Sequence, residues 1–241
     1  MNESDRSGGS RQAGTPGHGP GPERDGATDG GEEPDQGTDS GRVEAFSDGV
    51  FAIAITLLIL EIKVPEVGEH GGLWHALGGQ WPSYAAYVVS FLVIGIMWIN
   101  HHQVFRHVAR VDRTLMFLNL LVLMVVAAVP WPTAMLAEYL REDEASHVAA
   151  AVYSLVMVAM ALAFQALWWH LTRTGHLFDA RVDVEGARRT RVRFALGSLA
   201  YPATVALAFV SAPLTLAVHG LLAVYYAFNQ APVPMRPARE A

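Results

Sequence analysis

Three polar residues stand at the start of the first long apolar run of the chain. Arg42, Ser47 and Asp48 occur in the stretch 42–61, which reads RVEAFSDGVFAIAITLLILE. A hydroxyl or carboxylate at a helix start accepts hydrogen bonds from free backbone N–H groups and favours the positive end of the helix dipole. The same groups could instead bind polar side chains of neighbouring helices. The residues alone leave helix capping and a specific polar network equally open.

A second polar cluster, with two neighbouring histidines, occurs in the stretch 98–103, which reads WINHHQ. Adjacent side chains on a helix point about 100° apart, so His101 and His102 cannot both face one partner. A zinc-binding helix has histidines at i and i+4 plus a third ligand, and His102 and His107 miss that spacing. No carboxylate is expected beside them within the apolar segments. We therefore predict a hydrogen-bonding role for one histidine and no metal site.

A third polar group, Asn119, lies within the apolar stretch 114–124, TLMFLNLLVLM. A buried asparagine needs partners from a neighbouring helix, and His101 or Asp48, at a similar depth, could supply them. Three further polar residues stand isolated among apolar neighbours, and they predict interhelical hydrogen bonds or interface positions. They are Gln165, His170 and His219.

Six apolar runs must position these groups, and each is long enough to cross a bilayer as a helix of about 20 residues. The runs lie near 46–64, 82–102, 114–136, 147–170, 191–211 and 213–230. The loops after the second and fourth runs are rich in arginine, whereas those after the first and third are mainly acidic. Because basic loops remain in the cytoplasm, this alternation places both termini there. The chain is predicted to be an all-α, multi-pass membrane protein with six transmembrane helices.

The composition divides the chain into three parts. Residues 1–41 contain almost no large apolar side chains and are predicted to form a disordered cytoplasmic tail. Residues 42–231 form the membrane domain, and residues 232–241 form a short cytoplasmic tail. The chain has no cysteine, which excludes disulfides and thiolate chemistry. No basic stripe with interleaved aromatic residues occurs, so no nucleic-acid partner is expected.

Several motifs of other membrane proteins are absent from the sequence. It has neither the Thr-Val-Gly-Tyr-Gly filter of familiar potassium channels nor the arginine ladder of a voltage sensor. It also lacks a phosphate-binding glycine-rich loop, and no run pairs a serine with a histidine and an acid at one depth. We therefore predict that the protein is not an enzyme.

Three motifs, taken in order, resemble those of the transmembrane protein 175 family of potassium channels, the endolysosomal type and its bacterial relatives. The first motif is R-x-x-x-F-S-D-x-x-x-A-I-x-x-T at 42–56, and it is specific. The second is W-x-x-H-x-x-x-F at 98–105, and the third is T-L-x-x-L-N-L at 114–120. Each of these two motifs is weak evidence alone, but their occurrence in this order is strong evidence for the resemblance. The resemblance covers all six runs.

This resemblance implies a potassium-permeable, modestly selective cation channel of the inner (plasma) membrane. The channel would need no cofactor, and its partners would be the lipid bilayer and the permeant potassium ion. A single repeat of six helices is similar to the bacterial form, a homotetramer in which the first helix lines the pore. Ile53 then matches the apolar constriction, Leu57 and Leu60 match further pore-lining rings, and Ile53 and Thr56 match positions of ion selection.

The resemblance also implies a polar network that holds the pore helix against the second and third helices. Its expected members are Arg42, Phe46, Ser47, Asp48, Trp98, His101 and Asn119.

A proton-coupled secondary transporter, with Asp48 and His101 as a proton relay, is the alternative. Transporters usually interrupt helices near the membrane midplane with Gly or Pro, and they often contain inverted repeats. The first run has no such break after Gly49, and its centre is apolar apart from Thr56. This pattern favours the channel.

Overall fold

Helices account for most of the described part of the chain, as the apolar runs predict. The computed structural model describes residues 36–66, 72–228 and 233–236, and no β-strand occurs within these ranges. The elements, in chain order, are α1 (Gln36–Leu57), the 3-10 turn η1 (Leu58–Glu61), α2 (Leu73–Gly79), α3 (Trp81–Phe105), α4 (Arg113–Ala128), α5 (Pro130–Tyr139), α6 (Asp143–Thr174), α7 (Val184–Ser198), α8 (Ala200–Ala208) and α9 (Ala212–Phe228). The prediction of an all-α fold is confirmed.

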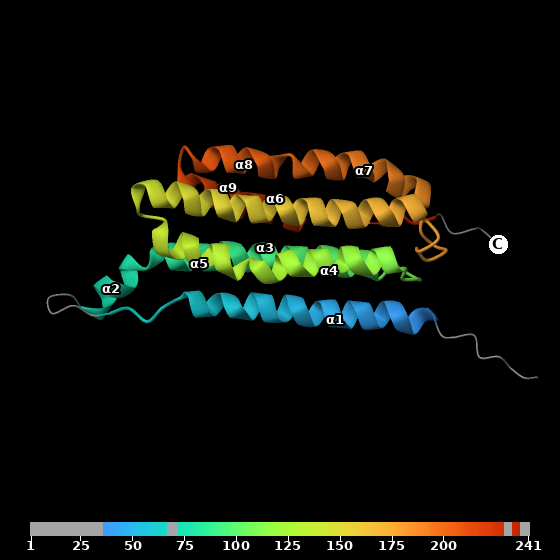
Figure 1. Cartoon of the computed structure of the whole chain (residues 1–241), viewed down its shortest axis with the longest axis horizontal. Coiled ribbons are helices and arrows are strands. Elements are labelled where there is room, and N and C mark those ends of the chain that lie inside the picture. Colours follow the sequence, from blue (N-terminus) through green and yellow to red (C-terminus); the bar gives the residue numbers. More distant parts are fainter. Residues whose placement is uncertain (1–35, 67–71, 229–232, 237–241) are drawn as a thin grey trace, which may run out of the picture. The chain divides into compact units, whose positions relative to one another are not determined.

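The long helices run side by side, as Figure 1 shows. α6 packs against α4, α5, α7, α8 and α9, and it contributes many of the fully buried side chains of the core. α3 contacts α1, α5 and α9, whereas α1 packs chiefly against α3 and α4. The first helix is therefore held on one side by its own chain.

Four helices of the described chain are long and apolar enough to cross a membrane. They cover Ser40–Glu61, Trp81–Phe105, Arg113–Tyr139 and Asp143–Thr174, and they correspond to the first four predicted runs. The third of these joins α4 to α5 across Val129. Pro130 begins α5 and has no backbone N–H to donate, which interrupts the hydrogen-bond ladder at this point.

The last two predicted runs differ from the observed helices. The run at 191–211 is divided, because α7 ends at Ser198 and α8 begins at Ala200. Pro202 accounts for the interruption, since it has no N–H for the carbonyl four residues earlier. α9 has 17 residues, somewhat fewer than the length of about 20 that spans a bilayer. The count of six spans remains a prediction.

The ends of the predicted domains also differ in one place. α1 begins at Gln36, earlier than the predicted start of the first run at 46 and within the predicted tail. The rest of that tail, residues 1–35, and residues 237–241 of the C-terminal tail lie outside the described residues.

The two arginine-rich loops meet at one end of the helices. The Ala109 N–H donates to the Leu177 carbonyl at 2.8 Å, and the Asp179 N–H donates to the His107 carbonyl at 2.9 Å. Both loops therefore lie on the same side, as their charge predicts. We call this the basic end of the bundle, and the opposite end, where η1 and α2 lie, the acidic end.

Candidate functional site

The first helix has two faces with different environments. Phe51, Ala54 and Leu58 recur at helical spacing and are at most 2% exposed, because they pack against the neighbouring helices. On the other face, Ile53, Leu57 and Leu60 are 60%, 42% and 70% exposed. The predicted pore-lining residues thus share one apolar face, which the chain itself leaves uncovered.

Thr56 lies beside this apolar face, and its hydroxyl is bonded within the helix. Its Oγ1 is 2.9 Å from the carbonyl oxygens of both Ala52 and Ile53, so it donates its proton to the backbone. Such a bond fixes the side-chain rotamer and directs the oxygen lone pairs away from the helix. The exposed threonine therefore presents an acceptor and not a donor.

A fully buried chain of hydrogen bonds joins α1 to α4 and α3. Asn119 Nδ2 donates to Ser47 Oγ at 2.9 Å, and Ser47 Oγ donates to the Val43 carbonyl at 2.8 Å. The other amide atom, Asn119 Oδ1, lies 2.7 Å from His101 Nε2. Because an amide oxygen can only accept, Nε2 of His101 must carry the proton. Ser47, His101 and Asn119 are 0%, 0% and 2% exposed.

Aromatic rings enclose His101 in this network. Its ring stacks on Phe105 with centroids 4.3 Å apart and lies 5.3 Å from Phe51. His101 Nδ1 is buried and has no hydrogen-bond partner in the described part of the chain. A proton on Nδ1 would add an unpaired buried charge, so this environment favours the neutral ring.

Asp48 belongs to a separate contact between α1 and α3. Trp98 Nε1 donates to Asp48 Oδ1 at 2.9 Å. His102, one turn after Trp98, stacks on the indole with centroids 5.8 Å apart, and its Nδ1 lies 2.8 Å from Glu44 Oε1. The expectation that no carboxylate accompanies these histidines was therefore wrong. A rule for spacing within one helix could not show that a glutamate of α1 faces His102 across the helix pair.

Two expected members of the network lie apart from it. Phe46 is 58% exposed and points away from the buried side of α1. Arg42 is also exposed, and within the described residues no hydrogen bond or ion pair joins it to another side chain. The structure thus brings together Ser47, His101 and Asn119, and separately Asp48 and Trp98.

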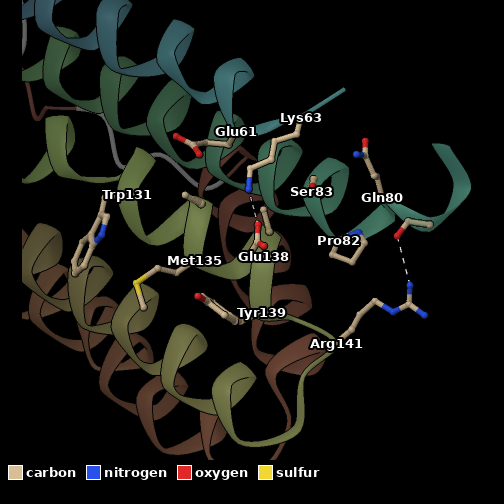
Figure 2. A pocket seen from close by; sticks show the side chains of 13 residues that line it. Glu61, Lys63, Gln80, Pro82, Ser83, Trp131, Met135, Glu138, Tyr139 and Arg141 are labelled. Atoms are coloured by element: carbon tan, nitrogen blue, oxygen red, sulfur yellow. Dashed lines mark hydrogen bonds and ion pairs between the residues drawn. The ribbon is translucent and has the colours of Figure 1, made fainter. Parts of the chain in front are cut away.

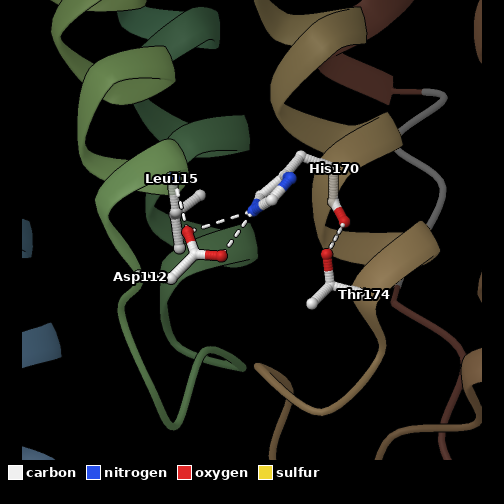
Figure 3. Close-up of polar contacts among 4 residues, drawn as sticks. All are labelled: Asp112, Leu115, His170 and Thr174. Carbon is white, nitrogen blue, oxygen red and sulfur yellow. Dashed lines mark hydrogen bonds and ion pairs between the residues drawn. The ribbon is translucent and has the colours of Figure 1, made fainter.

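The isolated polar residues have partners that the sequence did not identify. At the basic end, His170 Nε2 lies 2.8 and 3.0 Å from the two carboxylate oxygens of Asp112, as Figure 3 shows. Asp112 also caps α4 by accepting from the Leu115 N–H at 2.7 Å. Partial burial raises the pKa of the Asp112 carboxyl, but the Leu115 N–H and His170 outweigh it and leave this pKa below its ordinary value.

A second buried cluster ties the other half of the bundle together. Ser90 Oγ lies 2.8 Å from Thr133 Oγ1 and 3.1 Å from the Tyr153 hydroxyl. The next residue after Tyr153 is Ser154, and its Oγ lies 3.0 Å from His219 Nε2. These bonds link α3, α5, α6 and α9, and they are of the interhelical kind that the isolated polar residues predict.

A cavity of about 530 Å³ lies at the acidic end. Figure 2 shows Lys63 reaching Glu138, with their charged atoms 2.7 Å apart, near Trp131, Tyr139 and Arg141. Its lining combines acidic and basic side chains, so no net charge selects a ligand. We assign no function to this cavity.

The chain is similar in sequence to proteins of a known family. Residues 42–130 match the family described as Endosomal/lysosomal potassium channel TMEM175. A potassium channel of Streptomyces collinus is 86% identical over 200 residues, which cover 83% of this chain and 97% of that protein. A potassium channel of Chamaesiphon minutus is 45% identical over 82% of this chain and 98% of that protein.

A solved structure is similar to this chain over most of its length. It is the crystal structure of a lysosomal potassium-selective channel TMEM175 homolog from Chamaesiphon minutus. The two chains are 44% identical, with a TM-score of 0.69 over 79% of this chain and 97% of that one.

Proposed function

Because this chain belongs to the TMEM175 family of potassium channels, we propose that it conducts potassium through a pore lined by α1 from four copies. Members of this family are channels and not enzymes. The proposal concerns the pore, its selectivity and its assembly.

The exposed apolar face of α1 is the observation that carries the proposal. Only 22% of the apolar window of the first span is buried within the chain, against 44% for the span of α6. A surface of this kind must contact lipid or other copies of the chain. In a ring of four copies, the Ile53 side chains would meet around one axis and form an apolar constriction that dewets when narrow.

Ion selection at this constriction would rest on dehydration. Potassium holds its hydration shell less tightly than sodium does, so an apolar ring favours potassium, but only modestly. The Thr56 oxygen, with its proton donated to the backbone, would offer an acceptor to a partly dehydrated cation. Leu57 and Leu60 would extend the apolar lining toward the acidic end.

The buried bonds of Ser47 and Asn119 would fasten the pore helix. They fix the basic end of α1 to α4, and through His101 to α3, on the side opposite the exposed stripe. Asp48 and Trp98 add a second tie between α1 and α3. Arg42 and Phe46 would act by contacts outside this chain, since both are exposed.

The proposed membrane topology follows from the two ends of the bundle. The protein would lie in the inner (plasma) membrane with its basic end facing the cytoplasm, and both termini would lie on that side. The fifth span of the domain would come from α7 with α8, and the sixth from α9. Acidic loops at the other end would attract cations.

A proton relay through Asp48 and His101 receives no support from their geometry. Asp48 binds Trp98, whereas His101 binds Asn119, and no hydrogen bond joins the two side chains. A secondary transporter is therefore the weaker proposal.

Potassium flux through purified protein in liposomes tests the channel. We expect an ohmic single-channel current that persists without a proton gradient. A saturable flux that needs a proton gradient would overturn the proposal in favour of the transporter.

The variant Ile53→Asn tests the position of the pore. A polar ring is wetted more easily, so conductance should rise and the preference for potassium should fall. Leu162→Asn on α6 is a matched control, because Leu162 is 61% exposed and Ile53 is 60% exposed. If both variants conduct and select as the wild type does, α1 does not line the pore.

A further inference from the structure

Two carboxylates and an imidazole meet at the basic end of the first helix. Glu44 and Asp48 lie one turn apart on α1, and His102 faces them from α3. One ligand atom from each side chain lies within 4.8 Å of the other two. All three residues are half-buried.

Trp98 orients two of these three groups. Its indole N–H donates to Asp48 Oδ1 at 2.9 Å, which leaves the second carboxylate oxygen available as a ligand. The same indole stacks on the His102 ring with an interplanar angle of 27°. Partners of this kind fix ligand side chains in metal sites and raise the affinity for the ion.

The charge of the cluster favours a cation. Two carboxylates face a single imidazole, so the cluster carries a net negative charge whether or not His102 is protonated. The nearest arginine in sequence, Arg42, is exposed and makes no bond to it within the described residues. Like charges one turn apart on a helix repel each other, and a divalent ion between them would reduce that cost.

The donor set indicates the type of metal. Ca²⁺ and Mg²⁺ take oxygen ligands, whereas an imidazole together with carboxylates suits Zn²⁺. Ligand atoms around a tetrahedral Zn²⁺ lie about 3.3 Å apart, which follows from bond lengths of roughly 2.0 Å. The three ligand atoms here lie within 4.8 Å of one another, and His102 Nδ1 lies 2.8 Å from Glu44 Oε1.

An ion bound by this cluster is distinct from an ion in the proposed pore. At about 100° per residue, Glu44 lies about 180° and Asp48 about 140° around the helix from Ile53. The cluster therefore lies on the flank of α1 that packs against α3.

We propose that Glu44, Asp48 and His102 bind one Zn²⁺ ion, which water completes to four ligands and which joins α1 to α3. The site is independent of the proposed pore, because only these three side chains and Trp98 form it.

Calorimetric titration of the purified full-length protein with Zn²⁺, after removal of metal with EDTA, tests the site. We expect saturable binding of one ion per chain that millimolar Mg²⁺ does not displace. His102→Gln and Glu44→Gln should each raise the Kd at least tenfold. His75→Gln is the matched control, since His75 is an exposed histidine at the acidic end and should leave the Kd unchanged.

A spectroscopic measurement shows whether the imidazole binds the ion. Co²⁺ in place of Zn²⁺ should give the strong visible absorption of a four-coordinate site in the wild type and in His75→Gln, but not in His102→Gln. Zn²⁺ should also raise the Tm of the wild type more than that of Glu44→Gln. Equal Kd values for wild type and both site variants, or loss of binding only in His75→Gln, would overturn the proposal.

Discussion

Asn119 holds the two halves of the buried network together, so its replacement by leucine should loosen the first helix. Asn119→Leu keeps nearly the same volume but removes the bond to Ser47 at 2.9 Å and the bond to His101 at 2.7 Å. The buried Ser47 oxygen then loses its donor but keeps its own bond to the Val43 carbonyl, and the buried His101 N–H loses its acceptor. Interhelical hydrogen bonds in membrane proteins contribute about 0.6 kcal/mol on average and up to about 1.7 kcal/mol.

Two such bonds together give an expected destabilisation of about 1–3 kcal/mol for Asn119→Leu. Since about 1.4 kcal/mol is a tenfold change in an equilibrium constant, the unfolding constant should rise by roughly 5-fold to 150-fold. Reversible unfolding in mixed micelles, followed by loss of helical signal, measures this difference. Potassium flux in liposomes, recorded in parallel, shows whether a loosened α1 also changes conductance.

A double-mutant cycle with Ser47→Ala separates the hydrogen bond from the change in packing. Ser47 and Asn119 should show a coupling energy of about 0.6–1.7 kcal/mol, because each single change removes the same bond. Leu118→Ala with Ser47→Ala is the control pair, since Leu118 is the sequence neighbour of Asn119 and makes no bond to Ser47. Strict additivity of Ser47 and Asn119 would refute the proposed role of the network in holding α1.

Three further predictions concern positions outside the first helix. Gly175 ends α6 with φ of 68°, and an added Cβ would lie 3.1 Å from Val184 Cγ1. Gly175→Ala should therefore lower the Tm by the equivalent of about 1 kcal/mol. An unchanged Tm would contradict this prediction. Because the pKa of Asp112 is depressed in the folded state, its stabilising effect is present above the ordinary pKa of an aspartate and is lost as pH falls through the folded value. Wild type should therefore lose more stability than Asp112→Asn between pH 5 and pH 3, roughly the range that spans an unfolded aspartate pKa. Equal losses would argue against a stabilising role of the Asp112 carboxylate. Tyr153→Phe removes the bond to Ser90 at 3.1 Å and should lower the free energy of unfolding by about 0.6–1.7 kcal/mol in the same assay. A more stable variant would show that this bond does not stabilise the fold.

The sequence was most informative where polar residues interrupt apolar runs. Asn119 and His101 are conspicuous because a polar group within a span needs a partner, and the bond between them is present. The loop charges likewise indicated which loops share an end, and the loops around Ala109 and Leu177 do meet. The first inference uses the cost of a polar group in lipid, and the second uses the retention of basic loops on one side of the membrane.

Features that depend on the relative rotation of two helices could not be read from the sequence. Glu44 meets His102 because of the way α1 and α3 face each other, and Asp112 meets His170 for the same reason across α4 and α6. Spacing within one helix does not contain this information. The break between α7 and α8 is different, since Pro202 is visible in the sequence and its missing N–H suffices to predict an interruption.

The hydrogen bonds from α1 side chains to other helices all lie near the basic end of α1, so a rotation of the helix about this end would displace its other end most. Ser47 and Asp48 mark the fixed point, and at about 1.5 Å per residue Ile53 lies roughly 9 Å and Leu60 roughly 20 Å beyond Ser47. A rotation of about 5° around this point would displace Ile53 by about 0.8 Å and Leu60 by about 1.7 Å. Small rotations at the basic end would thus be about doubled at Leu60, where the apolar contacts of Leu58 and the ion pair between Lys63 and Glu138 oppose them.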